Sequence, residues 1–204
     1  MKTRLERPHV SVNMAMSLDG RITTRRHERL TLGTSHDRRL MDELRSGADA
    51  VIVGAGTVRH DGFPILVRND DVRRDAVARG RNPHPVNVVV SHSLDLPSTR
   101  PIFRRRETRK LVFTTKAAPM SRVRRFEKFA EVVVLRRRTL SPTVVLEYLG
   151  NLGMKKVLLE GGGELHFAFA REHVVDDIYV TLTPRLIGGV GAPTILDEIG
   201  RAHV

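Results

Sequence analysis

The feature that most constrains the fold lies near the C-terminal end, where an apolar run leads through a carboxylate into three glycines: Val157-Leu158-Leu159-Glu160-Gly161-Gly162-Gly163-Glu164-Leu165. This order predicts a buried strand, a glycine turn and the start of a helix. Such a turn presents backbone N–H groups and the positive end of a helix, and both suit a phosphate. Glu160 would then stand at the carboxyl end of the strand, where open α/β sheets hold their ligands.

A second unit of this kind lies upstream, where the apolar run 50–53 leads into Gly54-Ala55-Gly56-Thr57 and then Asp61. It matches neither a P-loop nor a dinucleotide fingerprint. Thr57 suits either a phosphate contact or a helix cap, and Asp61 suits either a ribose hydroxyl or a loop contact. The glycines by themselves meet the demands of a sharp turn. Two such units in one small chain favour a nucleotide or sugar-phosphate site.

Composition limits the class of protein. The 204 residues, of which 40% are hydrophobic, fit one globular domain over residues 1–204, with 1–8 as a flexible N-terminal segment. No apolar run approaches the roughly 18 residues of a membrane span. The sequence holds no cysteine, which excludes disulfides and suits a cytoplasmic protein. The histidines form no metal-binding motif, so we expect no metal site.

The formal net charge of +12 comes mainly from arginine, with runs at 104–106 and 136–138. A nucleic-acid surface and a solvated basic surface are both compatible with these runs. Arg45, at the end of a predicted helix, and Arg68, after the Asp61 loop, would form a phosphate clamp if they faced one cleft. Otherwise Arg45 favours its helix end by charge and Arg68 is a solvated loop residue. Glu160 likewise suits either a ligand contact or a bond to neighbouring backbone amides.

Apolar periodicity predicts strands that alternate with helices, which is the pattern of an α/β sheet covered on both faces. The predicted strands are 10–16, 50–54, 86–90, 110–114, 131–135, 156–159 and 178–183. The predicted helices are 34–46 with Thr34 as its cap, 119–129, 142–149 and 163–171. The polar stretch 69–85 is predicted as a long loop. The last strand alternates cleanly, so we expect it to be antiparallel or close to an edge of the sheet.

As a set, these residues resemble the pyrimidine reductases of riboflavin biosynthesis. The matching stretches keep the order of that family, and they are 13–22, 45–50, 54–61, 160–163 and 176–189. The resemblance implies a dihydrofolate-reductase-like, three-layer αβα fold with a mostly parallel sheet and an antiparallel strand near the C-terminus. It also implies NADPH as cofactor, a homodimer, and reduction of the ribosyl group of a phosphoribosylamino-pyrimidine to ribityl, with no nucleic acid or membrane as partner.

The resemblance also implies roles for particular residues. The expected cofactor contacts are Ala15, Thr57, Asp61, Ser91, Gly161, Gly162, Gly163, Glu164 and Leu165. The expected substrate contacts are Asn13, Arg45, Ile65, Arg68 and Glu160. Arg45 and Arg68 would grip the 5′-phosphate, Ile65 would line the pocket, and Glu160 would meet the pyrimidine or ribose as the catalytic residue. The cofactor carries the chemistry, so the protein mainly orients and stabilises.

Two departures from the family pattern bear on the substrate. The two-domain bacterial members carry a zinc deaminase before the reductase, for which this sequence offers no cysteine. Those members tend to have Lys where Asn13 stands, whereas Asn is typical of the free-standing archaeal and fungal type, which acts on the 2,5-diamino-pyrimidinone. A 5-amino-uracil substrate, a dihydrofolate-reductase-like enzyme for another heterocycle, and a basic nucleic-acid-binding module stay as alternatives. The family pattern also continues with closing strands, so we expect either a shorter sheet or a partner over its exposed edge.

Overall fold

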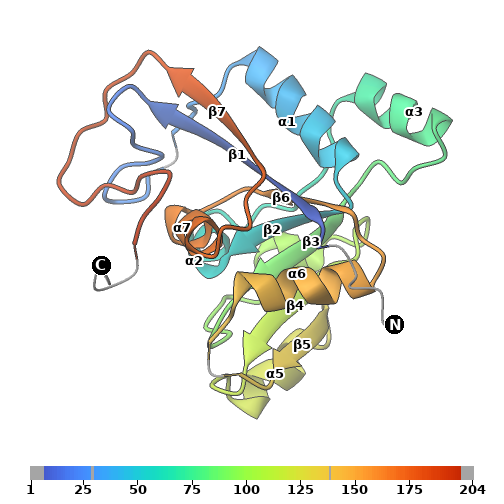
Figure 1. Cartoon of the computed structure of the whole chain (residues 1–204). Coiled ribbons are helices and arrows are strands. Elements are labelled where there is room, and N and C mark those ends of the chain that lie inside the picture. Colours follow the sequence, from blue (N-terminus) through green and yellow to red (C-terminus); the bar gives the residue numbers. More distant parts are fainter. Residues whose placement is uncertain (1–6, 29, 138, 199–204) are drawn as a thin grey trace.

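The computed structural model describes residues 7–28, 30–137 and 139–198. In this part of the chain a seven-stranded sheet forms the centre, in the order β5-β4-β3-β2-β6-β1-β7 (Figure 1). All its neighbouring strands run parallel. The strands are β1 (His9–Ser17), β2 (Ala50–Gly54), β3 (Val86–Val90), β4 (Lys110–Thr115), β5 (Glu131–Leu135), β6 (Lys156–Leu159) and β7 (Asp177–Thr183). The strand positions predicted from apolar runs are therefore confirmed to within a residue or two.

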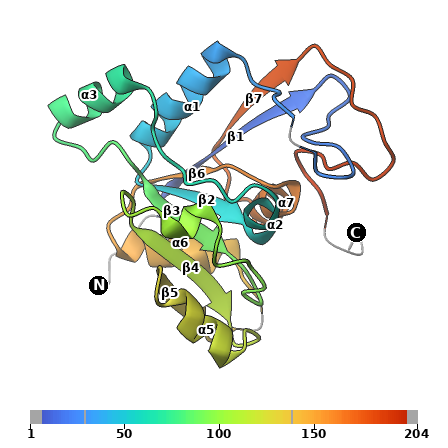
Figure 2. The same ribbon diagram turned by 180° about the vertical axis from the view of Figure 1, so that it is seen from behind.

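Helices cover both faces of this sheet, and they are α1 (Ser35–Gly47), α2 (Ala55–His60), α3 (Asp70–Ala78), α4 (Pro101–Arg104), α5 (Met120–Phe126), α6 (Pro142–Asn151) and α7 (Gly163–Arg171). One apolar cluster joins alternate strand residues to α6 and α7, through Leu146 and Phe169 among others. The second cluster joins the other face to α2, α4 and α5, through Val58 and Phe126 among others. α6 lies in front of the sheet in Figure 1, and α5 lies on the opposite face in Figure 2. This confirms the three-layer α/β architecture.

The sequence interpretation of β7 was wrong in one respect. β7 runs parallel to β1, with Ser11 to Ser17 opposite Asp177 to Thr183, and is not antiparallel. It does lie at the edge of the sheet, and Ile178, Val180 and Leu182 are exposed. The alternating pattern therefore carries no information on strand direction, and its apolar side chains are exposed because β7 is an edge strand with little cover.

The long loop predicted for residues 69–85 was also wrong, since its first half forms α3. The side chain of Asn69 caps this helix by accepting from the N–H groups of Asp71 and Val72. Ion pairs join Asp70 to Arg73 and Asp71 to Arg74 one turn apart. Such local pairs stabilise a helix that is polar almost all round. α3 lies beside α1 in both ribbon views (Figures 1 and 2).

The start of the described chain is tied to the segment that leads into β7. The guanidinium of Arg7 forms an ion pair with Asp176 at 2.7 Å, whereas residues 1–6 of the segment predicted to be flexible lie outside the described residues. The Thr34 side chain accepts from the N–H of Asp37, which confirms the predicted cap of α1. None of the helices in the described ranges has the length and hydropathy needed to cross a membrane.

Candidate functional site

The two glycine turns meet at the carboxyl ends of neighbouring strands. β2 and β6 pair directly, and the N–H of Gly54 donates to the carbonyl of Gly161 at 3.0 Å. Gly161 has a φ of +117°, a conformation that side-chain-bearing residues rarely adopt. One hydrogen bond therefore joins the turn that starts α2 to the turn that starts α7. The two candidate phosphate-binding units therefore lie side by side at one end of the sheet.

The three glycines of the C-terminal turn have different surroundings. A methyl group on Gly162 would find only the Thr57 hydroxyl, at 3.7 Å, so this position faces open space. A methyl group on Gly163 would overlap the Asp197 carboxylate and the Thr194 carbonyl. Gly162 and Thr57 therefore border the open part of the turn, whereas Gly163 packs beneath the chain segment near Asp197.

A cavity of about 260 Å³ opens beside these turns. Six residues singled out in the sequence line it together, and they are Arg45, Thr57, Asp61, Ile65, Arg68 and Glu160. They come from α1, α2, the end of β6 and the segment that follows α2. Further lining residues include Met41, Phe63, Pro64 and Ile102. The lining thus combines apolar side chains with a few charged groups, which is usual for small-molecule sites.

At the cavity wall, Arg45 and Glu160 form a two-point ion pair. Nε of Arg45 donates to Oε1 of Glu160 and Nη2 donates to Oε2, each at 2.6 Å. The side chains are 11% and 8% exposed. Burial alone would lower the pKa of Arg45, but the nearby charges of Glu160 and Asp42 outweigh it and the pKa lies above its ordinary value. The pair is an oriented unit joined by two charge-assisted hydrogen bonds.

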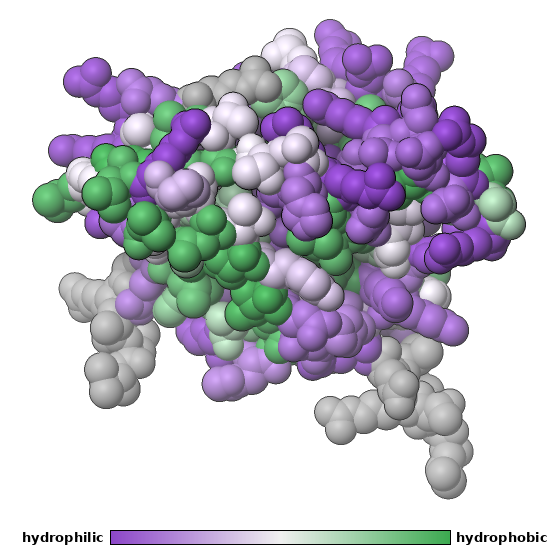
Figure 3. All heavy atoms as spheres, turned by 90° about the horizontal axis from the view of Figure 1, so that it is seen from above, coloured by the Kyte–Doolittle hydropathy of each residue, from purple (hydrophilic) through white to green (hydrophobic). Residues whose placement is uncertain are grey.

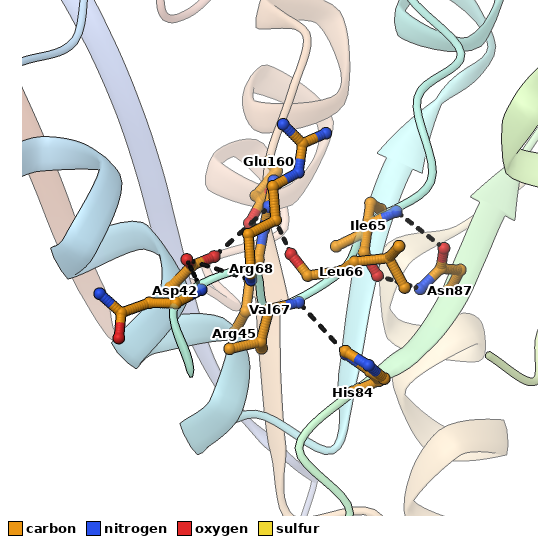
Figure 4. Close-up of polar contacts among 10 residues, drawn as sticks. Asp42, Arg45, Ile65, Leu66, Val67, Arg68, His84, Asn87 and Glu160 are labelled. Atoms are coloured by element: carbon orange, nitrogen blue, oxygen red, sulfur yellow. Dashed lines mark hydrogen bonds and ion pairs between the residues drawn. The ribbon is translucent and has the colours of Figure 1, made fainter. Parts of the chain in front are cut away.

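The wall between Arg45 and Arg68 is an extended segment without helix or strand, which we name the anchored segment (residues 65–69). Figure 4 shows side chains pointing at its backbone from both sides. Asn87 accepts from the Ile65 N–H and donates to the Ile65 carbonyl, each at 3.0 Å. Arg45 donates to the Leu66 carbonyl at 3.0 Å. Irregular backbone is buried here because side chains from elsewhere satisfy its polar groups.

The remaining residues of the predicted site lie outside the cavity lining. Asn13 is buried in β1, and its Oδ1 has no hydrogen-bond partner in the part of the chain that the structure describes. Ala15 lies two residues further along β1. Ser91 is buried at the end of β3, where its hydroxyl accepts from the Leu94 N–H at 3.1 Å. Glu164 and Leu165 form the first turn of α7. Their expected contacts stay predictions.

Sequence reasoning missed the residues that fix the anchored segment. Asn87 is the only polar residue of the strand Val86-Asn87-Val88-Val89-Val90, and a polar side chain in a buried strand requires partners. Asp42 stands three residues before Arg45 on α1, a spacing that places both on one helix face. Both signals are present in the sequence. Neither reveals that the partner is the backbone of residues 65–69.

Known proteins resemble this chain in sequence and in fold. The family model of the RibD C-terminal domain matches residues 8–203. The 2,5-diamino-6-ribosylamino-4(3H)-pyrimidinone 5′-phosphate reductase of Archaeoglobus fulgidus is 36% identical over 191 residues, which is 94% of this chain and 87% of that protein. The protein of the same name from Methanothermobacter thermautotrophicus is 35% identical over 95% of this chain and 86% of its own length. In fold, the chain is similar to a pyrimidine reductase-like protein of Corynebacterium diphtheriae, with a TM-score of 0.81 at 24% identity, over 93% of this chain and 80% of that one.

Proposed function

Because this chain belongs to the RibD C-terminal domain family, we propose that it is an NADPH-dependent reductase of 2,5-diamino-6-ribosylamino-4(3H)-pyrimidinone 5′-phosphate, which it converts from the ribosyl to the ribityl form. The observation that carries the proposal is the junction of two glycine turns beside a cavity that holds Arg45, Arg68 and Glu160. This junction offers bare backbone to a dinucleotide, and the cavity offers a cation to a sugar phosphate. The relatives from Archaeoglobus fulgidus and Methanothermobacter thermautotrophicus bear the name of this reaction.

The residues present fit the proposed cofactor. Gly162 has an open side that an added methyl group would fill, and Thr57, which borders that side, lines the neighbouring cavity together with Asp61. Thr57 offers a hydroxyl donor and Asp61 a carboxylate acceptor to a ribose hydroxyl. When bound, NADPH would supply the hydride that reduces the ribosyl C1′. The protein contributes orientation and charge around that carbon.

Arg68 would hold the substrate's phosphate. Its side chain is exposed at the cavity and, among the described residues, has no ion-pair partner. A guanidinium binds two phosphate oxygens at once. The Arg45 guanidinium already bonds Glu160 and the Leu66 carbonyl, so we assign it a supporting part of the predicted clamp, in which it orients Glu160 and adds positive charge.

Glu160 would accept a hydrogen bond from a ribose hydroxyl or a ring amine of the substrate. Each of its oxygens carries two lone pairs, and Arg45 occupies one on each. Asn13 lies next to this site in the sheet, since its neighbour Val12 pairs with Leu159. Its unpartnered amide oxygen suits an amino-bearing ring, which favours the diamino-pyrimidinone over the uracil.

We further propose that the protein acts in the cytoplasm without nucleic acid. The arginine runs at 104–106 and 136–137 lie too far apart in the fold to form one basic surface. The first precedes the start of β4 and the second follows the end of β5, and parallel strands put those points at opposite ends of the sheet.

A second copy of the chain is the proposed partner at the β7 edge. Apolar side chains gather on the side of the molecule where β7 lies, and polar ones on the side of α3 (Figure 3).

A cofactor titration with two glycine variants tests the proposed function. In Gly162→Ala the added methyl group has room as long as no cofactor is bound, and the φ of −87° at residue 162 suits alanine. We expect the variant to fold normally and to bind NADPH at least about tenfold more weakly, as measured by cofactor fluorescence. Gly162→Val should weaken binding further. The wild-type protein should also oxidise NADPH when given the phosphorylated substrate.

Arg68→Ala completes the test on the substrate side. We expect KM for the phosphorylated substrate to rise at least about tenfold, while the dephosphorylated analogue is affected much less.

Unchanged NADPH affinity in both Gly162 variants would remove the glycine turn from the cofactor site. Equal effects of Arg68→Ala on both substrates would remove Arg68 from the phosphate site.

A further inference from the structure

The position of Arg68 is set by its backbone, because its side chain has no bond of its own in the described part of the chain. Residue 68 stands at the exposed end of the anchored segment, after the buried residues Ile65 and Val67. A long side chain at the end of an irregular segment reaches a fixed point only if the backbone beneath it is fixed. The contacts of the Arg68 N–H group therefore decide where the guanidinium can reach.

Asp42 supplies those contacts. Its Oδ2 accepts from the N–H of Arg68 at 3.1 Å and from the N–H of Asn69 at 2.8 Å, across 26 and 27 residues of sequence (Figure 4). The Asp42 side chain is 8% exposed. Hydrogen bonds from two successive amides to one carboxylate are charge-assisted and fix the direction of the chain between them. Asp42 thus holds the point at which Arg68 leaves the segment.

The other oxygen of Asp42 faces the second arginine of the cavity. Oδ1 lies 4.0 Å from Nη1 of Arg45 and has no hydrogen-bond partner among the described residues. The buried carboxylate of Asp42 thus bonds the backbone of Arg68 and lies beside the guanidinium of Arg45. Because Asp42 and Arg45 stand one turn apart on α1, the helix sets the spacing of the two arginines.

The anchors of the segment divide its length between them. Asn87 holds Ile65, Arg45 holds Leu66, and His84 accepts from the N–H of Val67 at 3.2 Å. Among the described residues, only Asp42 accepts from the N–H groups of residues 68 and 69, while the side chain and carbonyl of Asn69 bond the first turn of α3. Loss of Asp42 would therefore loosen the backbone at Arg68 and leave the buried part of the segment and the cap of α3 in place.

We propose that Asp42 is a positioning residue that sets substrate-phosphate affinity through Arg68. The proposal rests on the proposed function, since it takes Arg68 as the phosphate ligand. Asp42 touches neither substrate nor cofactor. It acts by holding the Arg68 backbone so that the guanidinium meets the phosphate without first being ordered, which lowers the entropy lost on binding.

A double-mutant cycle tests this proposal. Asp42→Ala should raise KM for the phosphorylated substrate about tenfold and leave kcat within about twofold, because only binding is weakened. In an Arg68→Ala background the same substitution should change KM by less than about twofold, because residues that act as one unit are not additive. Asp42→Asn keeps one acceptor oxygen and should restore KM to near the wild-type value. Glu43→Ala, which removes an exposed carboxylate from the next position of α1, is the matched control.

Amide hydrogen exchange provides a readout that does not depend on turnover. Exchange at Arg68 and Asn69 should accelerate in Asp42→Ala and stay slow in Asp42→Asn and Glu43→Ala, while exchange at Ile65 is unchanged. Full additivity of Asp42→Ala with Arg68→Ala would overturn the proposal, as would unaltered exchange at residues 68 and 69. If Asp42→Ala fails to fold, the comparison of Asp42→Asn with wild type decides, since a raised KM with protected amides would contradict a role through the backbone.

The proposal and the proposed function can fail separately. Ribose 5-phosphate serves as a probe of the phosphate site, with binding measured by calorimetry in the absence of NADPH. If the wild type binds this probe in a manner that depends on Asp42 and Arg68 but never reduces the pyrimidine, the proposed function fails and the positioning role stands. If the wild type reduces the pyrimidine and Asp42→Ala has an unaltered KM, the positioning role fails and the function stands.

Discussion

Arg45 and Glu160 are 115 residues apart in the sequence and meet through two parallel hydrogen bonds of 2.6 Å. One comes from the end of α1 and the other from the residue after β6, so the contact exists only once the sheet has formed. It converts two costly buried charges into one oriented acceptor at the cavity. The contribution of this ion pair to stability can be measured apart from its role in the reaction. Removal of one partner leaves the other as an uncompensated buried charge, which lowers the free energy of unfolding.

We expect Glu160→Ala to lower the free energy of unfolding by about 3–5 kcal/mol, because it leaves Arg45 buried without its counter-charge. The double variant Arg45→Met, Glu160→Leu should recover most of this loss, since an apolar pair of similar volume replaces the ion pair. It should nevertheless show no turnover. Urea unfolding measures the first effect and NADPH oxidation the second.

The matched control is an ion pair of the same helix that faces solvent. Arg39 and Glu43 are joined at 2.9 Å with both side chains about half exposed. Glu43→Ala should cost no more than about 0.5 kcal/mol. A loss below about 1 kcal/mol in Glu160→Ala would show that the Arg45 charge reaches water.

Asn87 should prove as important for stability as any apolar core residue. It is fully buried in β3, and its side chain makes three hydrogen bonds, two to Ile65 and one to the Pro85 carbonyl. Asn87→Leu keeps the number and branching of the side-chain heavy atoms and leaves those backbone groups without partners, so we expect a loss of about 3 kcal/mol. Thermal or urea unfolding would measure it. The exposed Asn151→Leu should change stability by less than about 0.5 kcal/mol, and an equally small effect at Asn87 would contradict the assigned anchoring.

The sequence sufficed for the parts of the fold that depend on local patterns. Apolar runs located the strands, and Gly54 and Gly161 located the sheet ends that form the site, because buried strands and sharp turns restrict residue choice. Helix α3 was missed because its stability comes from the Asn69 cap and Asp–Arg pairs, which look the same in a solvated loop. The direction of β7 was missed because side-chain alternation is the same for both directions.

The residues of the candidate site could likewise be predicted only in part from the sequence. Six of the residues selected from the sequence do line one cavity. The anchors Asp42, His84 and Asn87 were not found, since their partners are backbone atoms of a segment whose path depends on the whole fold. Nor did the sequence show that Arg45 and Glu160 bond each other, because their spacing carries no pattern. Residue types are therefore predictable here, whereas their pairing is not.

Acid should weaken the fold in part through His84. Its Nδ1 accepts from the Val67 N–H at 3.2 Å, which requires that nitrogen to be unprotonated. Burial lowers the pKa of His84 below its ordinary 6.5, and the positive charge of Arg73 lowers it further, against the opposing charges of Glu107 and Asp42. The unfolded chain then binds the proton more readily than the folded one, so stability is lost as pH falls below about 6.5 towards the folded pKa.

A variant with an acceptor that does not titrate isolates this contribution. His84→Gln can offer its amide oxygen to the Val67 N–H at every pH. Urea unfolding between pH 7.5 and pH 5 should therefore show a smaller loss of stability in His84→Gln than in the wild type. His60 and His166, whose pKa values burial also lowers, are present in both proteins and cancel in the comparison. Identical pH profiles would show that His84 contributes nothing to the pH dependence of stability, contrary to the assignment.

The last prediction concerns the proposed homodimer, because no strand of residues 7–28, 30–137 or 139–198 covers the outer edge of β7. Ile178, Val180 and Leu182 lie on one face of that strand and are 60%, 42% and 55% exposed. Long apolar edge strands favour association unless they are covered. Val180→Glu would place a charge in the middle of the proposed interface, so we expect the wild type to sediment as a dimer and the variant to dissociate on dilution. Val77→Glu on α3, where the native valine is 61% exposed, is the matched control and should leave the dimer intact. A wild type that sediments as a monomer at every concentration, or equal dissociation of both variants, would remove β7 as the interface.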